Sequence, residues 1–311
     1  MPGILVYSAN AGLARELLTA AAGVAAAGPG QSAPVYALTL GEGCQPDELG
    51  GARVRAATAP VSIGDVAAVA GAVAAAARKL DCGIVLLGGD RRGKELAGRV
   101  GEKLGAGVVS GVTGFEPGED GTVARRDALG GAVVERCVVA TPTAVFAVAP
   151  RCFAEAPAAG EPQVEPIDLP ASSSNVRVVG REAKPAGGVD VAAANVLVAV
   201  GCGFAEREAA LGAEALATRL GGAVGCSKPL ATDRGWLGED RVIGISGKSC
   251  APQLALLLGV SGQVQFWAGV RDAKTIIAVN TDEGAPAMAM ADYSLVGDVR
   301  EVLPGLLAAI G

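Results

Sequence analysis

Residues 244–266, GISGKSCAPQLALLLGVSGQVQF, contain Gly247-Lys248-Ser249, the residue types that end a triphosphate-binding loop. Such a loop also needs a glycine five residues before Gly247, so that consecutive backbone N–H groups can surround the phosphates. Val242 stands at that position, and Pro252 allows a following helix to begin only near Ala251. The pattern therefore argues against a nucleoside triphosphatase, but it leaves open another way of holding a phosphate.

The sequence contains no histidine, which removes the commonest general base, proton shuttle and zinc ligand. Hydrolases that use a Ser-His-Asp or Cys-His arrangement are excluded in their ordinary form, as are dehydrogenases that rely on histidine. The seven cysteines are scattered and form no C-x-x-C pair, which favours reduced thiols in the cytoplasm over disulfides or a metal site. We therefore expect any redox or transfer chemistry to come from a cofactor.

Composition narrows the class of protein further. A net charge of −6 without a long basic run argues against nucleic acid as the main partner. No charge-free apolar stretch reaches the length of a membrane span, and the N-terminus leads directly into ILVY, a predicted first strand rather than a signal peptide. Apolar residues make up 50% and aromatic residues only 3%, so the core must be built from aliphatic side chains and closely packed glycines.

Glycine-rich segments follow the predicted strands of the C-terminal half. Gly201-Cys202-Gly203 provides the first two glycines of a G-x-G-x-x-G dinucleotide motif, but Glu206 stands at the third. Taken alone, this partial motif fits a tight strand-to-helix turn equally well. Further loops at 225–227, 244–249, 259–262 and 280–282 add backbone that can approach a ligand closely and N–H groups that can surround a pyrophosphate. Together they favour a dinucleotide cofactor in this half of the chain.

The surrounding pattern predicts an α/β protein of two domains. In the first, residues 4–7, 34–40 and 82–89 are expected strands, and residues 14–28, 62–80 and 94–107 are expected helices. Ser62, with Asp65 three residues later, resembles a capping box at the start of the second helix. Residues 121–150 read as several short strands. These elements predict a doubly wound, mostly parallel sheet with a late antiparallel portion.

We expect the N-terminal domain to cover residues 1–188, including a Pro/Ala/Gly-rich connection at about 154–188, and the C-terminal domain to cover 189–311. The alternative for this connection is a long irregular surface loop. In the second domain the expected strands are 195–201, 223–228, 241–246, 275–280 and 291–298, and the expected helices are 206–222, 251–259 and 300–311. This order is typical of a Rossmann-like nucleotide-binding unit.

At this point three long segments resemble the α subunit of electron transfer flavoproteins, including the nitrogen-fixation and carnitine-associated members. They are GCSKPLATDRGW at 225–236, SGKSCAPQLALLLGVSGQVQF at 246–266 and AGVRDAKTIIAVNTDEGAPAMAMADYSLVGDVREVLPGL at 268–306. With VAVGCG at 198–203 the resemblance covers about 110 residues in conserved order and spacing. It identifies the chain as a divergent member of that family.

The resemblance implies a subunit that holds FAD in its C-terminal domain and pairs with a β subunit. Such a heterodimer shuttles electrons between a flavin dehydrogenase and an acceptor, which is a quinone-reducing system or, in bifurcating variants, NADH or ferredoxin. Carried over by position, Ser246 replaces the threonine that bonds flavin N5, and Asn280 and Asp292 fall on the adenosine side. The other implied cofactor-binding residues are Cys202, Gly203, Ser227, Gly247, Lys248, Ser261, Gly262, Gln263, Val264, Gln265, Phe266, Thr281, Asp282 and Tyr293.

Each of these residues could instead be a turn or capping residue. Three positions also depart from the family: Cys202 replaces its flavin-facing arginine, Phe266 its histidine, and Ile245 a glutamine. Losing a positive charge near a reduced flavin should lower the flavin's reduction potential, unless Lys228, Lys248 or the partner compensates. The alternatives are a non-redox, nucleotide-binding paralogue with a regulatory role and an NAD-dependent transferase that shares the C-terminal fold.

Overall fold

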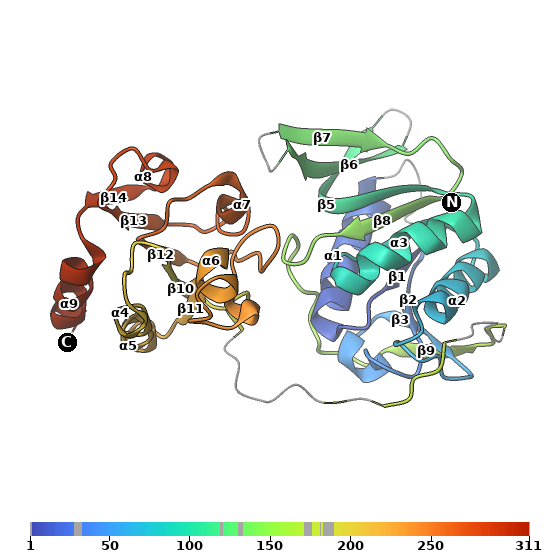
Figure 1. Ribbon diagram of the computed structural model, residues 1–311. Coiled ribbons are helices and arrows are strands. Elements are labelled where there is room, and N and C mark those ends of the chain that lie inside the picture. The colour runs from blue at the N-terminus through green and yellow to red at the C-terminus, as the bar shows by residue number, and fades with distance from the viewer. Residues whose placement is uncertain are drawn as a thin grey trace. The chain divides into compact units, whose positions relative to one another are not determined.

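The computed structural model describes residues 2–27, 33–118, 121–129, 133–170, 176–180, 182 and 190–310. The chain divides into two compact units, Met1–Glu182 (unit 1) and Ala183–Gly311 (unit 2) (Figure 1). The boundary predicted between residues 188 and 189 lies outside the described residues. Each unit is an α/β structure with its own sheet, in agreement with the predicted fold class.

Within the described residues, unit 1 forms a nine-stranded sheet in the order β7-β6-β5-β8-β4-β1-β2-β3-β9. The β5–β6 and β6–β7 pairs are antiparallel and the other neighbours are parallel, which confirms the mostly parallel sheet with a late antiparallel portion. The strands are β1 (Gly3–Tyr7), β2 (Val35–Thr39), β3 (Arg53–Ala57), β4 (Cys82–Gly88), β5 (Gly107–Gly118), β6 (Gly121–Ala128), β7 (Val133–Val138), β8 (Ala144–Val148) and β9 (Gln163–Ile167).

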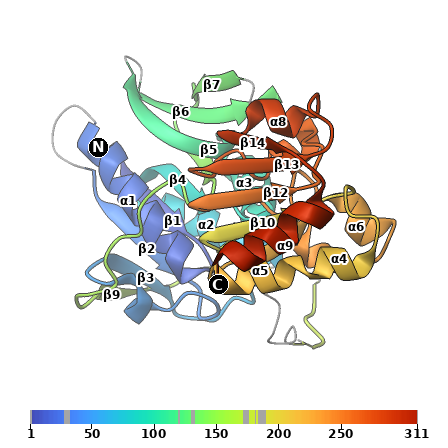
Figure 2. The same cartoon turned by 90° about the vertical axis from the view of Figure 1, so that its left-hand side faces the viewer.

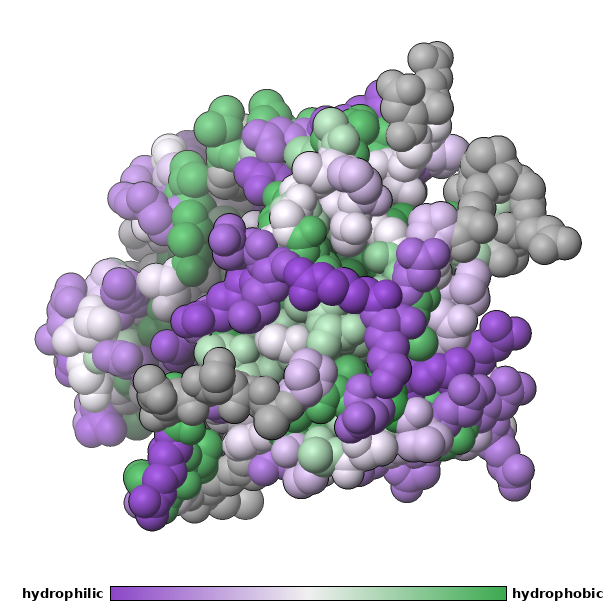
Figure 3. Space-filling view, turned by 90° about the vertical axis from the view of Figure 1, so that its right-hand side faces the viewer, coloured by the Kyte–Doolittle hydropathy of each residue, from purple (hydrophilic) through white to green (hydrophobic). Residues whose placement is uncertain are grey.

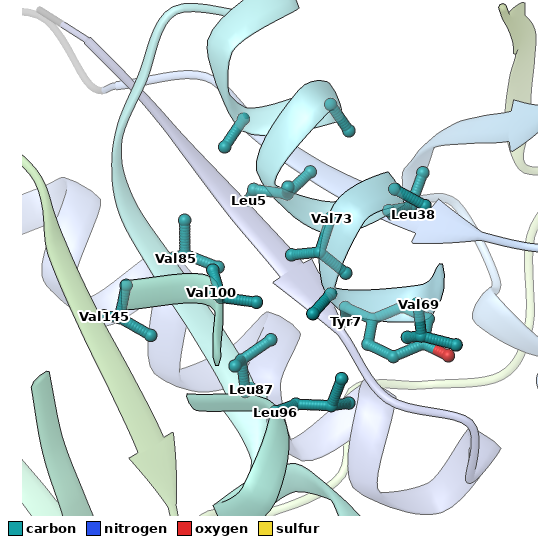
Figure 4. Close-up of a cluster of buried hydrophobic side chains, with 14 of the residues drawn as sticks. Leu5, Tyr7, Leu38, Val69, Val73, Val85, Leu87, Leu96, Val100 and Val145 are labelled. Carbon is teal, nitrogen blue, oxygen red and sulfur yellow. The ribbon is translucent and has the colours of Figure 1, made fainter. Parts of the chain in front are cut away.

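Helices cover both faces of this sheet, as expected for a doubly wound fold. Helix α1 (Ala11–Ala27) packs on one face, and α2 (Val66–Lys79) and α3 (Arg91–Leu104) pack on the other. Figure 4 shows the second interface, where aliphatic side chains from β1, β2, β4 and β8 meet those of α2 and α3. A short 3-10 helix, Pro46–Leu49, precedes β3.

Two local expectations in unit 1 need correction. Asp65, not Ser62, is the N-cap of α2, because its carboxylate accepts a hydrogen bond from the Ala68 N–H at 2.9 Å. The Pro/Ala/Gly-rich connection also contains β9, a parallel edge strand beside β3, and the Arg55–Glu165 ion pair links the two strands at 3.2 Å. An edge strand tolerates a proline such as Pro166, since one side of its backbone needs no sheet partner.

Over residues 190–310, unit 2 forms a five-stranded parallel sheet in the order β11-β10-β12-β13-β14. Figure 2 shows β10, β12, β13 and β14 side by side. The strands are β10 (Val196–Val200), β11 (Ala223–Cys226), β12 (Leu254–Leu258), β13 (Ile276–Asn280) and β14 (Tyr293–Val296). The helices are α4 (Arg207–Leu211), α5 (Ala213–Arg219), α6 (Lys228–Thr232), α7 (Val264–Trp267), α8 (Pro286–Met290) and α9 (Val299–Ile310), with a 3-10 turn at Glu239–Arg241.

The prediction of a helix over 251–259 is wrong, because this segment forms β12, a strand with neighbours on both sides. Its core residues Leu256, Leu257 and Leu258 are at most 6% exposed. A short run that is apolar at every position shows no period that separates a buried strand from a buried helix. The leucines favour a helix by local propensity. The segment nevertheless forms a strand, because it is buried in the sheet between two layers of helices.

Two further elements of unit 2 differ from expectation. The predicted strand at 241–246 is reduced to two isolated bridges, Cys226 with Val242 and Ile243 with Lys248. The predicted helix at 206–222 is interrupted at Gly212, where α4 ends and α5 begins.

Apolar surface remains visible between hydrophilic side chains on the face of the molecule in Figure 3, as is usual for folded proteins. Among the described residues, no helix combines the length and the hydropathy needed to cross a membrane.

Candidate cofactor-binding site

The topology of unit 2 places a crevice at the carboxyl ends of β10 and β12. The chain passes from β10 to β11 on one side and then returns to β12 on the other side, so the connections diverge there. Ligands of open α/β sheets bind outside the strand ends at this switch point. The loop after β10 is joined to β12 and its loop by the hydrogen bonds Gly201 N–H to Leu258 O and Gly203 N–H to Gly259 O, both 2.9 Å.

Glycine is required where these two loops cross. A Cβ on Gly203 would lie 2.7 Å from Gly259 Cα, and a Cβ on Gly201 would lie 2.3 Å from Gly259 O. Gly259 itself has φ +64, a conformation that favours glycine. The glycines therefore serve first to let two backbones approach each other, and only then to shape the space that a ligand can enter.

Beside this crossing lies a cavity of about 650 Å³, within the range of small-molecule and cofactor sites. Loops that follow several strands of the sheet contribute its walls, so the lining comes from distant parts of the sequence. The lining residues are Cys202, Gly203, Ser227, Lys228, Pro229, Ile243, Ile245, Ser246, Gly259, Val260, Ser261, Gln263, Gln265, Phe266, Asn280, Asp282 and Ala285.

Most of the residues proposed from the sequence meet at this cavity. Those that line it are Cys202, Gly203, Ser227, Ser246, Ser261, Gln263, Gln265, Phe266, Asn280 and Asp282. Those that do not line it are Gly247, Lys248, Gly262, Val264, Thr281, Asp292 and Tyr293.

Asp292 and Tyr293 lie at the amino ends of β13 and β14, on the opposite side of the sheet from the strand ends that border the cavity. The Asp292 carboxylate accepts a hydrogen bond from Ile276 N–H at 2.8 Å, at the amino end of β13, whereas Asn280 is at its carboxyl end. The rise of a strand puts these ends on the order of 13 Å apart. The carboxylate that follows the carboxyl end of β14 is Asp298, and hydrogen bonds from Arg300 lower its pKa to about 2.

Gly247 and Lys248 form no triphosphate loop. The backbone of Lys248 is engaged within its own turn, donating to Val242 O at 2.7 Å and accepting from Gly244 N–H at 3.0 Å. The element that follows is strand β12, so no helix N-terminus stands behind the loop to face a phosphate. This geometry supports the argument against a triphosphatase that rests on Val242, but the second reason given for it, a helix start near Ala251, is wrong.

Ser227 offers direct support for a polar ligand. Its Oγ is buried and has no hydrogen-bond partner in the described part of the chain, although the residue lines the cavity. A buried hydroxyl that lacks a partner costs free energy, and a ligand with a polar atom at this wall would remove that cost. The residues present thus fit a cofactor that carries hydrogen-bonding groups along its length.

Asn280 and Asp282 line the cavity but also hold its loops in place. The Asn280 amide donates to Val260 O at 2.9 Å, and its carbonyl oxygen accepts from Asp282 N–H at 3.0 Å. The Asp282 carboxylate accepts from Gly284 N–H at 2.9 Å. Both side chains therefore have the turn and capping role that was the alternative to direct cofactor contact, and they position β12 and β13 loops relative to each other.

The three departures from the family pattern all line this one cavity. Cys202 and Ile245 come from two loops, and Phe266 comes from helix α7. The Cys202 thiol is exposed, Ile245 is 66% exposed, and Phe266 is only 7% exposed and packs into the core of unit 2. Of the two lysines considered as compensating charges, Lys228 lines the cavity and Lys248 does not. The substitutions thus replace polar or charged groups by a thiol and apolar surface at the site itself.

Seven lining residues were not among the cofactor-binding residues implied by the resemblance: Lys228, Pro229, Ile243, Ile245, Gly259, Val260 and Ala285. The sequence had nevertheless indicated the loop at 259–262, Lys228 as a compensating charge and Ile245 as a departure from the family. Reading 251–259 as a helix placed the loop 259–262 after a helix, although it follows the central strand β12. A short apolar run followed directly by glycine is the signal that could have identified this segment as a buried strand.

Comparison with known proteins agrees with this geometry. Residues 11–173 match the electron transfer flavoprotein domain, and residues 190–271 match the electron transfer flavoprotein FAD-binding domain. Protein FixB of Escherichia coli O127:H6 is 32% identical over 230 residues, which cover 73% of this chain and 74% of that protein. Protein FixB of Salmonella typhimurium is 33% identical with the same coverage. The chain therefore belongs to the electron transfer flavoprotein family, as an α-subunit-like member.

Proposed function

We propose that this chain holds FAD in unit 2 and carries electrons between a flavin dehydrogenase and an acceptor. The acceptor would be a quinone-reducing system. In a bifurcating variant, NADH or ferredoxin would take its place. The observation that carries the proposal is the cavity of about 650 Å³ at the switch point of unit 2, lined by an unpartnered buried hydroxyl. Much of its lining falls within the segment that matches the FAD-binding domain.

The lining residues divide into two chemical groups that suit a flavin dinucleotide. Hydroxyl and amide side chains would hold polar parts of the cofactor, and Ser246 would hold the redox-active end, on the family correspondence. Ile243, Val260, Phe266 and Ala285 are buried and provide an apolar wall that excludes water. When bound, a flavin supplies one- and two-electron transfer by itself, which suits a chain without histidine.

The proposal includes a β subunit as partner, since the family resemblance is to the α subunit of a heterodimer. It also includes a reducing compartment such as the cytoplasm. In the described part of the chain the seven cysteines form no disulfide, and this suits such a compartment.

A second candidate, a nucleotide-binding paralogue without redox function, is favoured by one specific observation. The family's arginine and histidine are replaced by Cys202 and Phe266, and both substitutions face the cavity. Such a protein would keep the fold and a ligand while its electron-carrying role was lost.

Co-expression with the β subunit encoded nearest to this reading frame separates the candidates. The carrier predicts a yellow heterodimer with a flavin absorbance spectrum that bleaches when a flavin dehydrogenase and its substrate are added. A colourless complex would contradict FAD binding. A yellow complex that no dehydrogenase reduces, although dithionite does, would favour the paralogue.

A further inference from the structure

Arg234 lies outside the set of cavity-lining residues, but its guanidinium connects two of the loops that form the cavity. We propose that Arg234 is a positioning residue, which holds the loop after β10 against the segment after β11 and so fixes one wall of the cofactor site. The role in cofactor binding rests on the proposed function, whereas the positioning of the loop does not.

The first of the two connected segments is the loop after β10. Cys202 and Gly203 of this loop line the cavity, and Phe204 follows them with a fully buried side chain. The Phe204 carbonyl oxygen accepts a hydrogen bond from Arg234 Nη1 at 2.7 Å. A cation that donates to a carbonyl forms a stronger hydrogen bond than a neutral donor does. The bond therefore holds the backbone immediately beside the two lining residues.

The second segment is α6 with the turn that follows it. Ser227, Lys228 and Pro229 at its start line the same cavity. The turn is closed by Arg234 N–H donating to Pro229 O at 3.0 Å. The backbone of Arg234 thus belongs to the β11 side of the cavity, while its side chain reaches the β10 side.

Trp236 holds the guanidinium in the orientation that this bond needs. The Arg234 Cζ lies 4.6 Å from the centroid of the Trp236 ring, in a cation–π arrangement. The backbone of Trp236 is itself fixed, because its backbone N–H donates a hydrogen bond to Leu230 O at 2.8 Å. Arginine suits the position because a planar guanidinium can stack on a ring and donate a hydrogen bond in its plane at the same time.

Arg234 is exposed, and the core of unit 2 packs without it. Its contribution therefore lies in the placement of the β10 loop rather than in the folding of the unit. Arg219 provides a matched comparison, because its Nη1 also donates to a backbone carbonyl, that of Leu307, at 2.5 Å in the same unit. Arg219 joins α5 to α9 and does not line or border the cavity.

The experiment compares Arg234→Met, Arg234→Lys and Arg219→Met in the heterodimer after removal of FAD. Titration with FAD should show a dissociation constant raised about tenfold by Arg234→Met, which equals about 1.4 kcal/mol. Arg234→Lys should recover part of the affinity, since it keeps the charge and one donor, and Arg219→Met should bind FAD like the wild type. The visible circular dichroism of bound flavin should change in Arg234→Met alone.

Hydrogen exchange in the FAD-free protein tests the positioning without any cofactor. Arg234→Met should speed exchange in the peptide that covers 201–205, and Arg219→Met should leave this peptide unchanged. Unchanged exchange at 201–205 in Arg234→Met would overturn the proposal, whatever happens to FAD affinity. If the wild type takes up no FAD, the proposed function fails, but the exchange result still decides whether Arg234 positions the loop.

Discussion

β1 in unit 1 and β10 in unit 2 occupy equivalent places in their sheets. Each is the first strand of its unit and lies where the chain changes direction, between β4 and β2 in one case and between β12 and β11 in the other. The crevice at the carboxyl ends of β1 and β4 has a volume of about 20 Å³, whereas the one beside β10 and β12 has about 650 Å³. The first can hold no more than a water molecule, and the second can hold a cofactor.

Side-chain volume accounts for the difference. In unit 1 the crevice is filled by Tyr7, which is 4% exposed, and by apolar residues from α2 and α3 such as Val69 and Leu96. Burial raises the pKa of Tyr7 well above its usual range, so its hydroxyl stays protonated and uncharged. In unit 2 the residues after β10 are Gly201, Cys202 and Gly203, which leave the space open. At these two equivalent places, the side chains near the strand ends thus decide whether the crevice is open.

The comparison is tested most severely by Tyr7→Ala, which removes the largest side chain from the closed crevice. We expect a loss of about 3–5 kcal/mol in the stability of unit 1, since a large buried side chain leaves a cavity. FAD uptake by unit 2 should be unchanged. Hydrogen exchange of β1 measures the stability of unit 1. Tryptophan fluorescence measures the unfolding of unit 2, because Trp236 and Trp267 are the two tryptophans of the chain. Tyr7→Phe is the control, and equal destabilisation by both variants would contradict the role of side-chain volume.

Gly201→Ala changes the open crevice of unit 2 instead. Its Cβ would lie 2.3 Å from Gly259 O, so the loops after β10 and β12 must separate. We expect a cost of about 1–3 kcal/mol in unit 2 and a weaker hold on FAD. Gly305→Ala in α9 meets no atom within 4 Å and should be neutral or slightly stabilising. Chemical unfolding followed by tryptophan fluorescence measures both, and wild-type behaviour of Gly201→Ala would show that the loop crossing is not needed.

Cys202→Arg restores the family's charge at the mouth of the open crevice. A positive charge near the bound flavin should stabilise its reduced, negatively charged form and raise its reduction potential by about 59 mV or more. Cys202→Ser adds no charge and should leave the potential close to that of the wild type. Spectroelectrochemical titration of the heterodimer measures the shift. A potential that does not move in Cys202→Arg would mean that this position does not face the flavin.

Ser227→Ala tests the unpartnered hydroxyl. We expect FAD binding to weaken by about 1 kcal/mol, while the FAD-free protein keeps its stability or gains a little, because a buried group without a partner has been removed. Ser294→Ala on β14 is the control, since this exposed residue does not line the cavity. Calorimetric titration and thermal melting give the two quantities. If Ser227→Ala were less stable than the wild type without FAD but bound FAD normally, Ser227 would not be a cofactor-binding residue.

Glu16→Gln probes how unit 1 holds the loop after β8, and its effect should be the smallest. The Glu16 carboxylate is 6% exposed and accepts from Arg151 N–H at 2.6 Å, and burial raises its pKa. Because the pKa is raised on folding, the folded state favours the protonated form. The contribution of Glu16 to the free energy of unfolding is therefore at its maximum below the unfolded pKa of about 4.5. It declines as the pH rises through the folded pKa. The wild type should lose stability relative to Glu16→Gln over that window, measured by urea unfolding between pH 4 and about 8. A difference between the two proteins that does not vary with pH would contradict the raised pKa.

The sequence pattern predicted the parallel strands correctly where they alternate with amphipathic helices. Leu96, Val100 and Leu104 mark the buried side of α3, although this helix begins and ends three residues before the predicted range of 94–107. It failed at β12, which it read as a helix, and it gave no strand for β3, β5 or β9. In β12 every residue is apolar, so the pattern carries no period, and in β9 the pairing with β3 depends on a segment more than a hundred residues away in the chain.

For the site, the sequence by itself determined that unit 2 ends its strands in glycine-rich loops and that Cys202, Ile245 and Phe266 depart from the family pattern. Only the tertiary structure decided which of these loops meet around one cavity. It also placed Asp292 at the amino ends of the strands, away from that cavity. It also decided that the equivalent crevice of unit 1 is filled. Local residue types determine turns and strand ends, but the neighbours of each strand end are set by sheet order and burial, which join segments far apart in the sequence.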